Sequence, residues 1–210
     1  MKITIVTLTR NRLPYTKVCF DLLKKKAGYD YEHIVVDNGS TDGTVEWLEN
    51  MGYNTIKNKE NLGITAGLKQ AVDKIKKCDL VIKFDNDCEL LTDNTLKKIV
   101  EFYKDNGMEY SVSPKIHGLN NPPKGCKTRV GNYEFEKIDM IGGIFRTISY
   151  EHFINMAKTM DSLRDEKITY YLRENKINSG YLLELNANHY ETTNGQIERL
   201  GDEYHKNYIY

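Results

Sequence analysis

Short apolar runs alternate with helical stripes of apolar side chains along the first half of the chain. Four apolar runs predict β-strands, at residues 2–7, 31–37, 54–57 and 79–84. A helical stripe follows each run, and the first begins after Pro14, which suits the first turn of a helix. Four strand–helix units in succession predict an α/β domain with a mostly parallel central sheet flanked by helices, because parallel strands need crossover connections.

The boundaries of the later helices are indicated by single residues. A short helix carries Val45 and Leu48, and a longer stripe covers residues 64–75. The fourth helix is predicted around residues 96–103, with Thr92 as its N-cap and Asn106-Gly107 at its end.

The second half of the chain is less regular. Residues 115–131 contain two adjacent prolines and three glycines, which predicts a long loop. A strand is predicted over 133–141 and ends at Gly142-Gly143. Further elements are helices at 149–160 and 165–174, a strand at 181–186, and a polar tail at 191–210 that we expect to be an arm or a terminal helix.

The composition of the chain argues against some kinds of binding partner. Lys and Arg together number 30, as do Asp and Glu, so the net charge of zero argues against electrostatic attraction to nucleic acid or anionic membranes. No run approaches the roughly 18 apolar residues of a membrane helix, so we expect no stable membrane insertion. The first residues do not resemble a signal peptide, and the four cysteines lack a C-x-x-C pair, so we expect a cytoplasmic protein with reduced thiols.

Polar and charged residues follow three of the predicted strands. Thr7 precedes an arginine-bearing loop, Asp37 precedes a turn, and Asp85-Asn86-Asp87 follows the fourth strand. Ligands of open parallel sheets bind outside the carboxyl ends of the strands. We therefore expect these three segments to meet at one edge of the sheet.

The pair Asp85 and Asp87 is a candidate cation site. Two neighbouring carboxylates are costly to bury unless a cation joins them, and Mg²⁺ or Mn²⁺ commonly takes one or two carboxylates plus substrate phosphates. A calcium-binding loop is excluded, because Leu90 and Leu96 stand where it needs Gly and Glu. Alternatively, Asp85 and Asp87 only stabilise a turn, because Asp favours turn positions, and the same alternative applies to Asp37.

Four segments carry a specific resemblance. Residues 5–12, 34–44, 61–67 and 84–87 resemble the ordered motifs of family 2 glycosyltransferases of the GT-A fold. The likeness continues more weakly to His189. It implies a GT-A catalytic domain at 1–190, with a nucleotide-sugar-binding half at 1–114 and an acceptor half at 115–190, followed by the tail at 191–210.

The family implies a reaction and a set of donor-binding residues. A nucleotide-diphosphate sugar, UDP-linked by resemblance, would give its sugar to an acceptor hydroxyl with inversion, assisted by Mn²⁺ or Mg²⁺. Thr7 and Arg10 would border the nucleotide, Asp37 would contact the base, and Asp85 would reach the ribose or a metal-bound water. The implied donor set is Thr7, Arg10, Asp37, Asn61, Gly63, Asp85 and Asn86.

The resemblance also implies metal ligands and a base. Asp87, with Asp85 and His189, would hold the metal, and Gly142-Gly143 would lie beneath the sugar and the acceptor. The family's acidic pair usually reads Glu-Asp, whereas this chain has Asp165-Glu166, so either is a candidate for the catalytic base. Acids in a first helical turn also complement the helix dipole, and a lone histidine is often an ordinary residue.

Other functions remain open at this stage. A nucleotidyltransferase would need a glycine-rich loop after the first strand, and residues 8–13 contain no glycine. A non-catalytic nucleotide-binding protein is the other alternative. The acceptor could be a saccharide, a lipid-linked saccharide, a protein or a nucleic acid. Basic residues in the segment 115–131 favour an anionic acceptor, although they equally suit a solvated loop; they are Lys115, His117, Lys124, Lys127 and Arg129.

Overall fold

The computed structural model describes residues 1–119 and 122–189. Its central sheet has the strand order β3-β2-β1-β4-β9, and all pairs are parallel except β4 with β9. The mostly parallel α/β sheet is thus confirmed, with one antiparallel strand at its edge. Its strands are β1 (Ile3–Thr9), β2 (Glu32–Asn38), β3 (Asn54–Asn58), β4 (Leu80–Phe84) and β9 (Phe145–Ser149).

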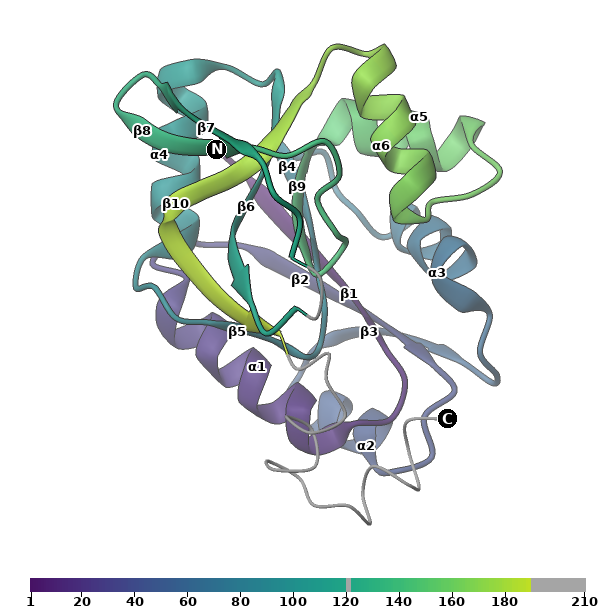
Figure 1. Ribbon diagram of the computed structural model, residues 1–210. Helices are drawn as coiled ribbons and strands as arrows, with labels where there is room; N and C mark the ends of the chain where they lie inside the picture. Colours follow the sequence, from purple (N-terminus) through teal and green to yellow (C-terminus); the bar gives the residue numbers. More distant parts are fainter. Residues whose placement is uncertain (120–121, 190–210) are drawn as a thin grey trace.

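Helices cover both faces of this sheet (Figure 1). α3, α5 and α6 lie on one face, and α1 and α4 on the other. Alternation along the strands supplies both layers: Ile5 of β1 packs in the α1 layer, whereas its neighbour Val6 packs in the α3 layer. The helices are α1 (Leu13–Lys26), α2 (Thr44–Asn50), α3 (Gly63–Val72), α4 (Thr95–Asn106), α5 (Tyr150–Thr159) and α6 (Asp165–Glu174).

A second sheet is built from the later part of the chain. Its order is β5-β10-β8-β7, and β6 pairs in parallel with β10. Thr147 of β9 joins the two sheets, because its hydroxyl accepts a hydrogen bond from the Val112 N–H of β6 at 2.8 Å. The strands are β5 (Cys88–Leu90), β6 (Tyr110–His117), β7 (Cys126–Val130), β8 (Tyr133–Lys137) and β10 (Asn178–His189).

The prediction of a loop over residues 115–131 is wrong at both ends. β6 continues to His117, and β7 begins at Cys126. β7 is exposed almost throughout, so it lacks the apolar alternation that marks a strand. A two-residue turn joins it to β8, with Gly131 at a φ of 56°.

Other elements also differ from the prediction. The predicted strand 133–141 ends at Lys137, β9 was not expected, and the last strand is twice as long as the predicted 181–186. Thr92 is not the N-cap of α4, which is Asn94. The Thr92 hydroxyl instead accepts a hydrogen bond from the Asn186 N–H at 2.9 Å, a contact across 94 positions. The predicted tail at 191–210 lies outside the described residues.

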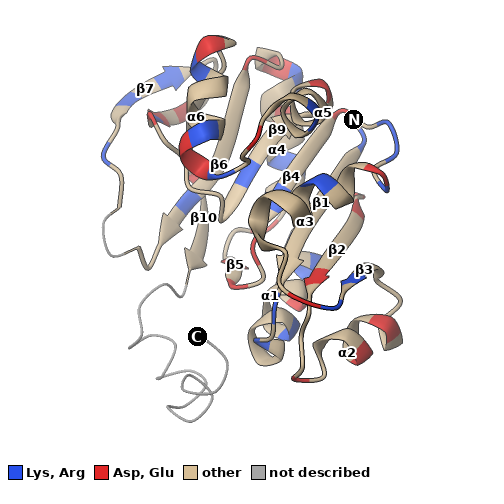
Figure 2. Cartoon of the chain, turned by 90° about the vertical axis from the view of Figure 1, so that its right-hand side faces the viewer, with Lys and Arg blue, Asp and Glu red and all other residues tan. Residues whose placement is uncertain are grey.

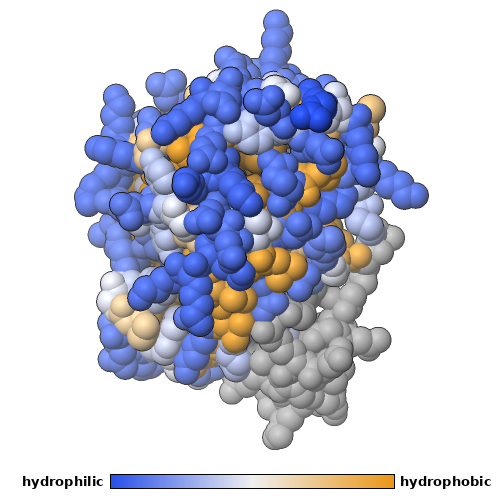
Figure 3. All heavy atoms as spheres, turned by 90° about the vertical axis from the view of Figure 1, so that its left-hand side faces the viewer, coloured by the Kyte–Doolittle hydropathy of each residue, from blue (hydrophilic) through white to orange (hydrophobic). Residues whose placement is uncertain are grey.

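The surface agrees with the balanced composition. Lys and Arg positions are interspersed with Asp and Glu positions along the chain, for example in α5 and α6 (Figure 2). Another face is mostly hydrophilic, with apolar side chains in patches between polar ones (Figure 3). Among residues 1–119 and 122–189, no helix combines the length and the apolar character that a bilayer crossing needs.

Candidate functional site

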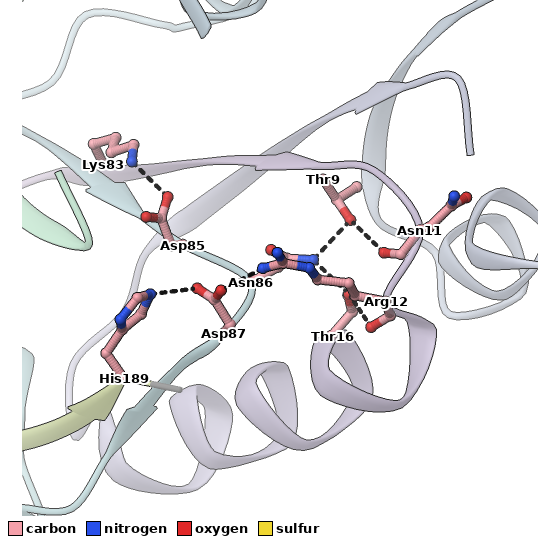
Figure 4. A network of polar contacts seen from close by, with 9 residues as sticks. All are labelled: Thr9, Asn11, Arg12, Thr16, Lys83, Asp85, Asn86, Asp87 and His189. Carbon is pink, nitrogen blue, oxygen red and sulfur yellow. Dashed lines mark hydrogen bonds and ion pairs between the residues drawn. The ribbon is translucent and has the colours of Figure 1, made fainter. Parts of the chain in front are cut away.

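The turn after β4 is tied to its surroundings by buried hydrogen bonds (Figure 4). The Asn86 side-chain NH₂ donates to the hydroxyls of Thr9 and Thr16, each at 3.0 Å. These bonds fasten the turn to the end of β1 and to α1. The NH₂ group of Asn86 is therefore engaged within the protein, and a donor contact by this residue stays a prediction.

Asp87 is paired with two basic side chains from distant parts of the chain. It is 5 % exposed, and its Oδ2 accepts a hydrogen bond from Arg12 Nη1 at 2.6 Å. Its Oδ1 lies 3.3 Å from His189 Nε2 (Figure 4). Burial acts to raise the pKa of Asp87, but the hydrogen bond and charge of His189, with the charge of Arg12, more than offset it, so the pKa is lowered.

Arg12 is the residue that the sequence reasoning missed, since the resemblance points to Arg10. Arg10 is exposed, whereas Arg12 is the N-cap residue of α1, in the left-handed region at a φ of 63°. This backbone conformation carries the side chain to Asp87, 75 positions away. The following Pro14 marks the helix start, but no sequence signal indicates which of the two arginines turns inward.

Asp85 is paired with a different cation. Lys83 Nζ donates to its Oδ1 at 2.5 Å, and the Asp85 side chain is 26 % exposed. Burial raises the pKa of Asp85, and Lys83 opposes that rise. The two aspartates thus have separate partners, although they are two positions apart.

A divalent cation fits this edge as a partly built site. Among the residues that the structure describes, no group of three or more His, Cys, Asp or Glu side chains is arranged to hold a metal. Asp87 Oδ1 and His189 Nε2 lie 3.3 Å apart, however, and a cation that took both atoms as ligands would replace their direct contact. The carboxylate oxygen is a ligand that Mn²⁺ and Mg²⁺ prefer. Ions of this class complete their coordination with substrate phosphates and water. Arg12 occupies the other oxygen of Asp87 and would have to share it.

The nucleotide residues implied by the resemblance lie deeper than expected. Asp37 is fully buried, and its Oδ1 accepts hydrogen bonds from the N–H groups of Gly39 at 3.1 Å and Ser40 at 2.8 Å. The Ser40 hydroxyl bonds its other oxygen. Burial raises the pKa of Asp37, against the opposing effect of these hydrogen bonds.

Thr7 and Asn61 are likewise engaged within the protein. The buried Thr7 hydroxyl hydrogen-bonds the His33 ring at 3.0 Å. The exposed Asn61 accepts a hydrogen bond from the N–H of Gly63, the first residue of α3, at 3.0 Å. Contacts of Thr7, Asn61 and Gly63 with a nucleotide stay predictions.

A cavity of about 740 Å³ opens on the α3, α5 and α6 side of the sheet. Its polar wall contains Lys83, Asp85, Asp165 and His189. Apolar side chains of α3, α5, α6, β6 and β9, and of the loops before β9 and α6, form much of the rest. A cavity of about 800 Å³ lies at the amino ends of β1 and β2. Sheets of this kind bind ligands at the carboxyl ends, so the former is the candidate site.

Asp165, rather than Glu166, faces this cavity. Asp165 Oδ2 accepts a hydrogen bond from the Gly143 N–H at 2.9 Å, and its Oδ1 lies 3.2 Å from Arg146 Nη1. A Cβ at Gly143 would stand 2.7 Å from Asp165 Oδ1 and 2.9 Å from Lys83 Nζ, so glycine is what allows this close approach. Glu166 is exposed and is not part of the cavity wall. Gly142 lines the same wall.

Solved structures with the same architecture are glycosyltransferases of the GT-A fold. A mannosyltransferase of Pyrobaculum calidifontis, PcManGT, solved with GDP-Man and Mn²⁺, matches with a TM-score of 0.70 at 16% identity, over 92% of this chain and 58% of that one. S. aureus TarS 1-349 with UDP-GlcNAc gives 0.69 at 17% identity, over 93% and 61%. GalNAc-T7, solved with UDP, GalNAc and Mn²⁺, gives 0.69 at 13% identity, over 90% and 43%.

The sequence itself places the chain in a family. Residues 4–157 match the model of glycosyl transferase family 2, which is well over half of the 210 residues. No curated protein sequence matches the chain. The chain therefore belongs to glycosyl transferase family 2 and has the GT-A fold, and both predictions are confirmed. It spans between 43% and 61% of the length of the three solved chains.

Proposed function

We propose that the protein transfers a sugar from a nucleotide-diphosphate sugar to an acceptor hydroxyl. One observation carries this proposal: His189, which contacts Asp87, and Asp165 line the same cavity. One member of a candidate cation-binding pair and a candidate base thus face one space at the carboxyl edge of the sheet. A transferase that activates a leaving diphosphate and deprotonates an acceptor needs both groups near the sugar.

Asp87 and His189 are the residues that would hold a divalent cation, Mn²⁺ or Mg²⁺. When bound, such a cation would neutralise the negative charge that grows on the diphosphate as the sugar leaves. Arg12 would add a fixed positive charge beside Asp87. PcManGT and GalNAc-T7 were solved with Mn²⁺, which supports the same requirement here.

Asp165 is the proposed base. Its carboxylate would take the proton of the acceptor hydroxyl as the new bond to the sugar forms. Attack on the face of the sugar opposite the diphosphate gives inversion. UDP is the proposed nucleotide, by the family resemblance and because TarS was solved with UDP-GlcNAc.

A donor screen tests the proposal. Thermal stability would be measured with UDP- and GDP-sugars, each with and without Mn²⁺, followed by assay of nucleoside diphosphate release. We expect at least one donor to stabilise the fold only when Mn²⁺ is present and to be turned over. A protein that no donor stabilises, and that releases no diphosphate, would contradict the proposal.

Asp165→Asn and Glu166→Gln form a matched pair in the first turn of α6. The Asp165→Asn variant should bind the donor normally but lose about 100-fold or more of its turnover, because the base is gone. The Glu166→Gln variant should keep both, since Glu166 lies outside the cavity wall. The reverse outcome would assign the base to Glu166.

A further inference from the structure

Arg146 is a buried charge at the wall of the cavity. It lies in β9 opposite Lys83 of β4 and is 1 % exposed. Burial lowers the pKa of its guanidinium, and Asp165 opposes that shift. A charge withdrawn from water is costly unless its partners are well placed, so the contacts of Arg146 indicate what it is for.

Those contacts join two separate parts of the chain. Arg146 Nη1 lies 3.2 Å from Asp165 Oδ1 at the start of α6, and Nη2 donates to the carbonyl oxygen of Ile141. Gly143, two residues after Ile141, donates its N–H to the other oxygen of Asp165 at 2.9 Å. The guanidinium therefore fixes both the loop before β9 and the carboxylate that the loop binds.

The geometry leaves one side of the carboxylate open. The Arg146 side chain is 2 % exposed, whereas the Asp165 side chain is 45 % exposed. A carboxylate has about four lone-pair positions, and these contacts use one on each oxygen. The remaining positions are available to a hydroxyl in the cavity.

We propose that Arg146 is a positioning residue, which holds the Asp165 carboxylate at a fixed angle toward the acceptor hydroxyl. This inference rests on the proposed function, since it assumes that Asp165 is the base. Orientation matters for such a group, because a misplacement of about 1 Å can cost about 100-fold in rate. An ion pair that only attached α6 to the sheet would affect stability and leave the catalytic step unchanged.

Three variants separate the two roles. Arg146→Met removes the charge at similar length, and Arg146→Lys keeps it. Arg173→Met is the control, because Arg173 is also an arginine paired with an aspartate, Asp139 at 3.4 Å, but lies at the exposed end of α6. Hydrogen exchange of the Gly143 amide, measured by NMR, reports directly whether Asp165 still accepts its hydrogen bond.

We expect Arg146→Met to change the position of the Asp165 carboxylate and, as a consequence, the rate of catalysis. In Arg146→Met, exchange of the Gly143 amide should rise about tenfold or more, and the Lys variant should restore most of the protection. With a donor from the screen, kcat should fall by about 10- to 100-fold while KM and the affinity for UDP with Mn²⁺ change little. Arg173→Met should match the wild type in Gly143 exchange, kcat, KM and UDP affinity.

Each other outcome has a separate meaning. Unchanged Gly143 exchange and unchanged kcat in Arg146→Met would overturn the inference. A parallel loss of kcat, UDP affinity and thermal stability would also overturn it, because it would show a structural role. If Arg146→Met does not fold, Arg146→Gln takes its place in the same measurements, because glutamine is also uncharged but can still donate a hydrogen bond to the Ile141 carbonyl oxygen. Absence of turnover in the wild type with every donor would overturn the proposed function, while Gly143 exchange would still decide the position of Asp165.

Discussion

The ends of β2 and β4 each carry a buried aspartate, yet the two are held in opposite ways. Asp37 is bonded by Gly39 and Ser40, two and three positions along the chain. Asp87 is bonded by Arg12 and His189, from the start of α1 and the end of β10. Turn chemistry thus accounts for the contacts of Asp37, whereas those of Asp87 require the whole fold.

This difference indicates what each carboxylate can do. The bonds of Asp37 satisfy the backbone of its own turn, so its loss should affect mainly the local structure. Asp87 brings together two cationic or basic groups from distant elements and lies beside the cavity through His189. Structural need alone does not call for such an arrangement, because a buried charge that must be compensated from two distant elements is expensive.

The largest expected effect is at Asp87. The Asp87→Asn variant keeps the shape of the side chain but removes the charge that would hold a cation, so donor turnover should fall about 100-fold or more. Assay of diphosphate release with Mn²⁺, beside a thermal melt, checks this. Turnover close to that of the wild type would remove the distinction between the two aspartates.

Asp37→Ala should behave in the contrasting way. It leaves the N–H groups of Gly39 and Ser40 without their acceptor in a partly buried turn, which should cost about 1–3 kcal/mol of unfolding free energy. Mn²⁺ affinity should be retained. Denaturant unfolding and calorimetric titration with Mn²⁺ measure the two quantities, and a loss of Mn²⁺ binding would show that the ends of β2 and β4 are not independent. Weaker UDP binding would support the predicted contact with the base.

His33, on the same strand as Asp37, gives the β2 region a pH dependence of its own. Burial among aromatic rings lowers the pKa of His33 to about 3, and its neutral ring bonds Thr7. In the unfolded chain His33 takes up a proton near pH 6.5, whereas in the folded protein it stays neutral at that pH. The free energy of unfolding therefore falls as the pH drops below about 6.5. We expect a loss of about 1–2 kcal/mol between pH 7 and pH 5.

Unfolding curves at the two pH values check this expectation. His33→Gln can keep a hydrogen bond to Thr7 but does not titrate, so its stability should change less over the same range. An equal slope in the wild type and the variant would assign the pH dependence to other groups.

The smallest effect is expected at Arg12. Because Arg12 occupies one oxygen of Asp87, Arg12→Gln should bind Mn²⁺ about two- to fivefold more tightly in the absence of donor. Arg10→Gln is the matched control and should leave Mn²⁺ affinity unchanged, since Arg10 is exposed. Calorimetric titration of both variants measures the difference. Weaker Mn²⁺ binding in Arg12→Gln would mean that Arg12 supports the site rather than competes for it.

The contrast between local and long-range contacts also explains which elements the sequence could predict. Strands β1 to β4 and their helices were predictable, because apolar periodicity marks elements that pack on a buried parallel sheet. β7 could not be found in this way, since its side chains are exposed and its partner β8 is needed to form it. β9 follows a glycine-containing loop and runs directly into α5, with no turn signal between Ser149 and Tyr150.

Some residues of the candidate site were also predictable from the sequence, and others were not. The residues at strand ends, Asp37 and Asp85-Asn86-Asp87, could be identified because strand ends of one sheet share an edge. The pairing of Arg12 with Asp87, and of Arg146 with Asp165, joins residues 75 and 19 positions apart through backbone geometry that no local pattern encodes. Which of Asp165 and Glu166 lines the cavity could likewise not be predicted, because it depends on the position of α6 against the cavity.

The affinity for UDP with and without Mn²⁺ tests the central claim most directly. Calorimetric titration of the wild type should show UDP binding about tenfold or more tighter with Mn²⁺ than with a chelator, and Asp87→Asn should show nearly equal affinities. Equal affinities in the wild type, or the same gain from Mn²⁺ in Asp87→Asn, would contradict a cation held at Asp87 and His189.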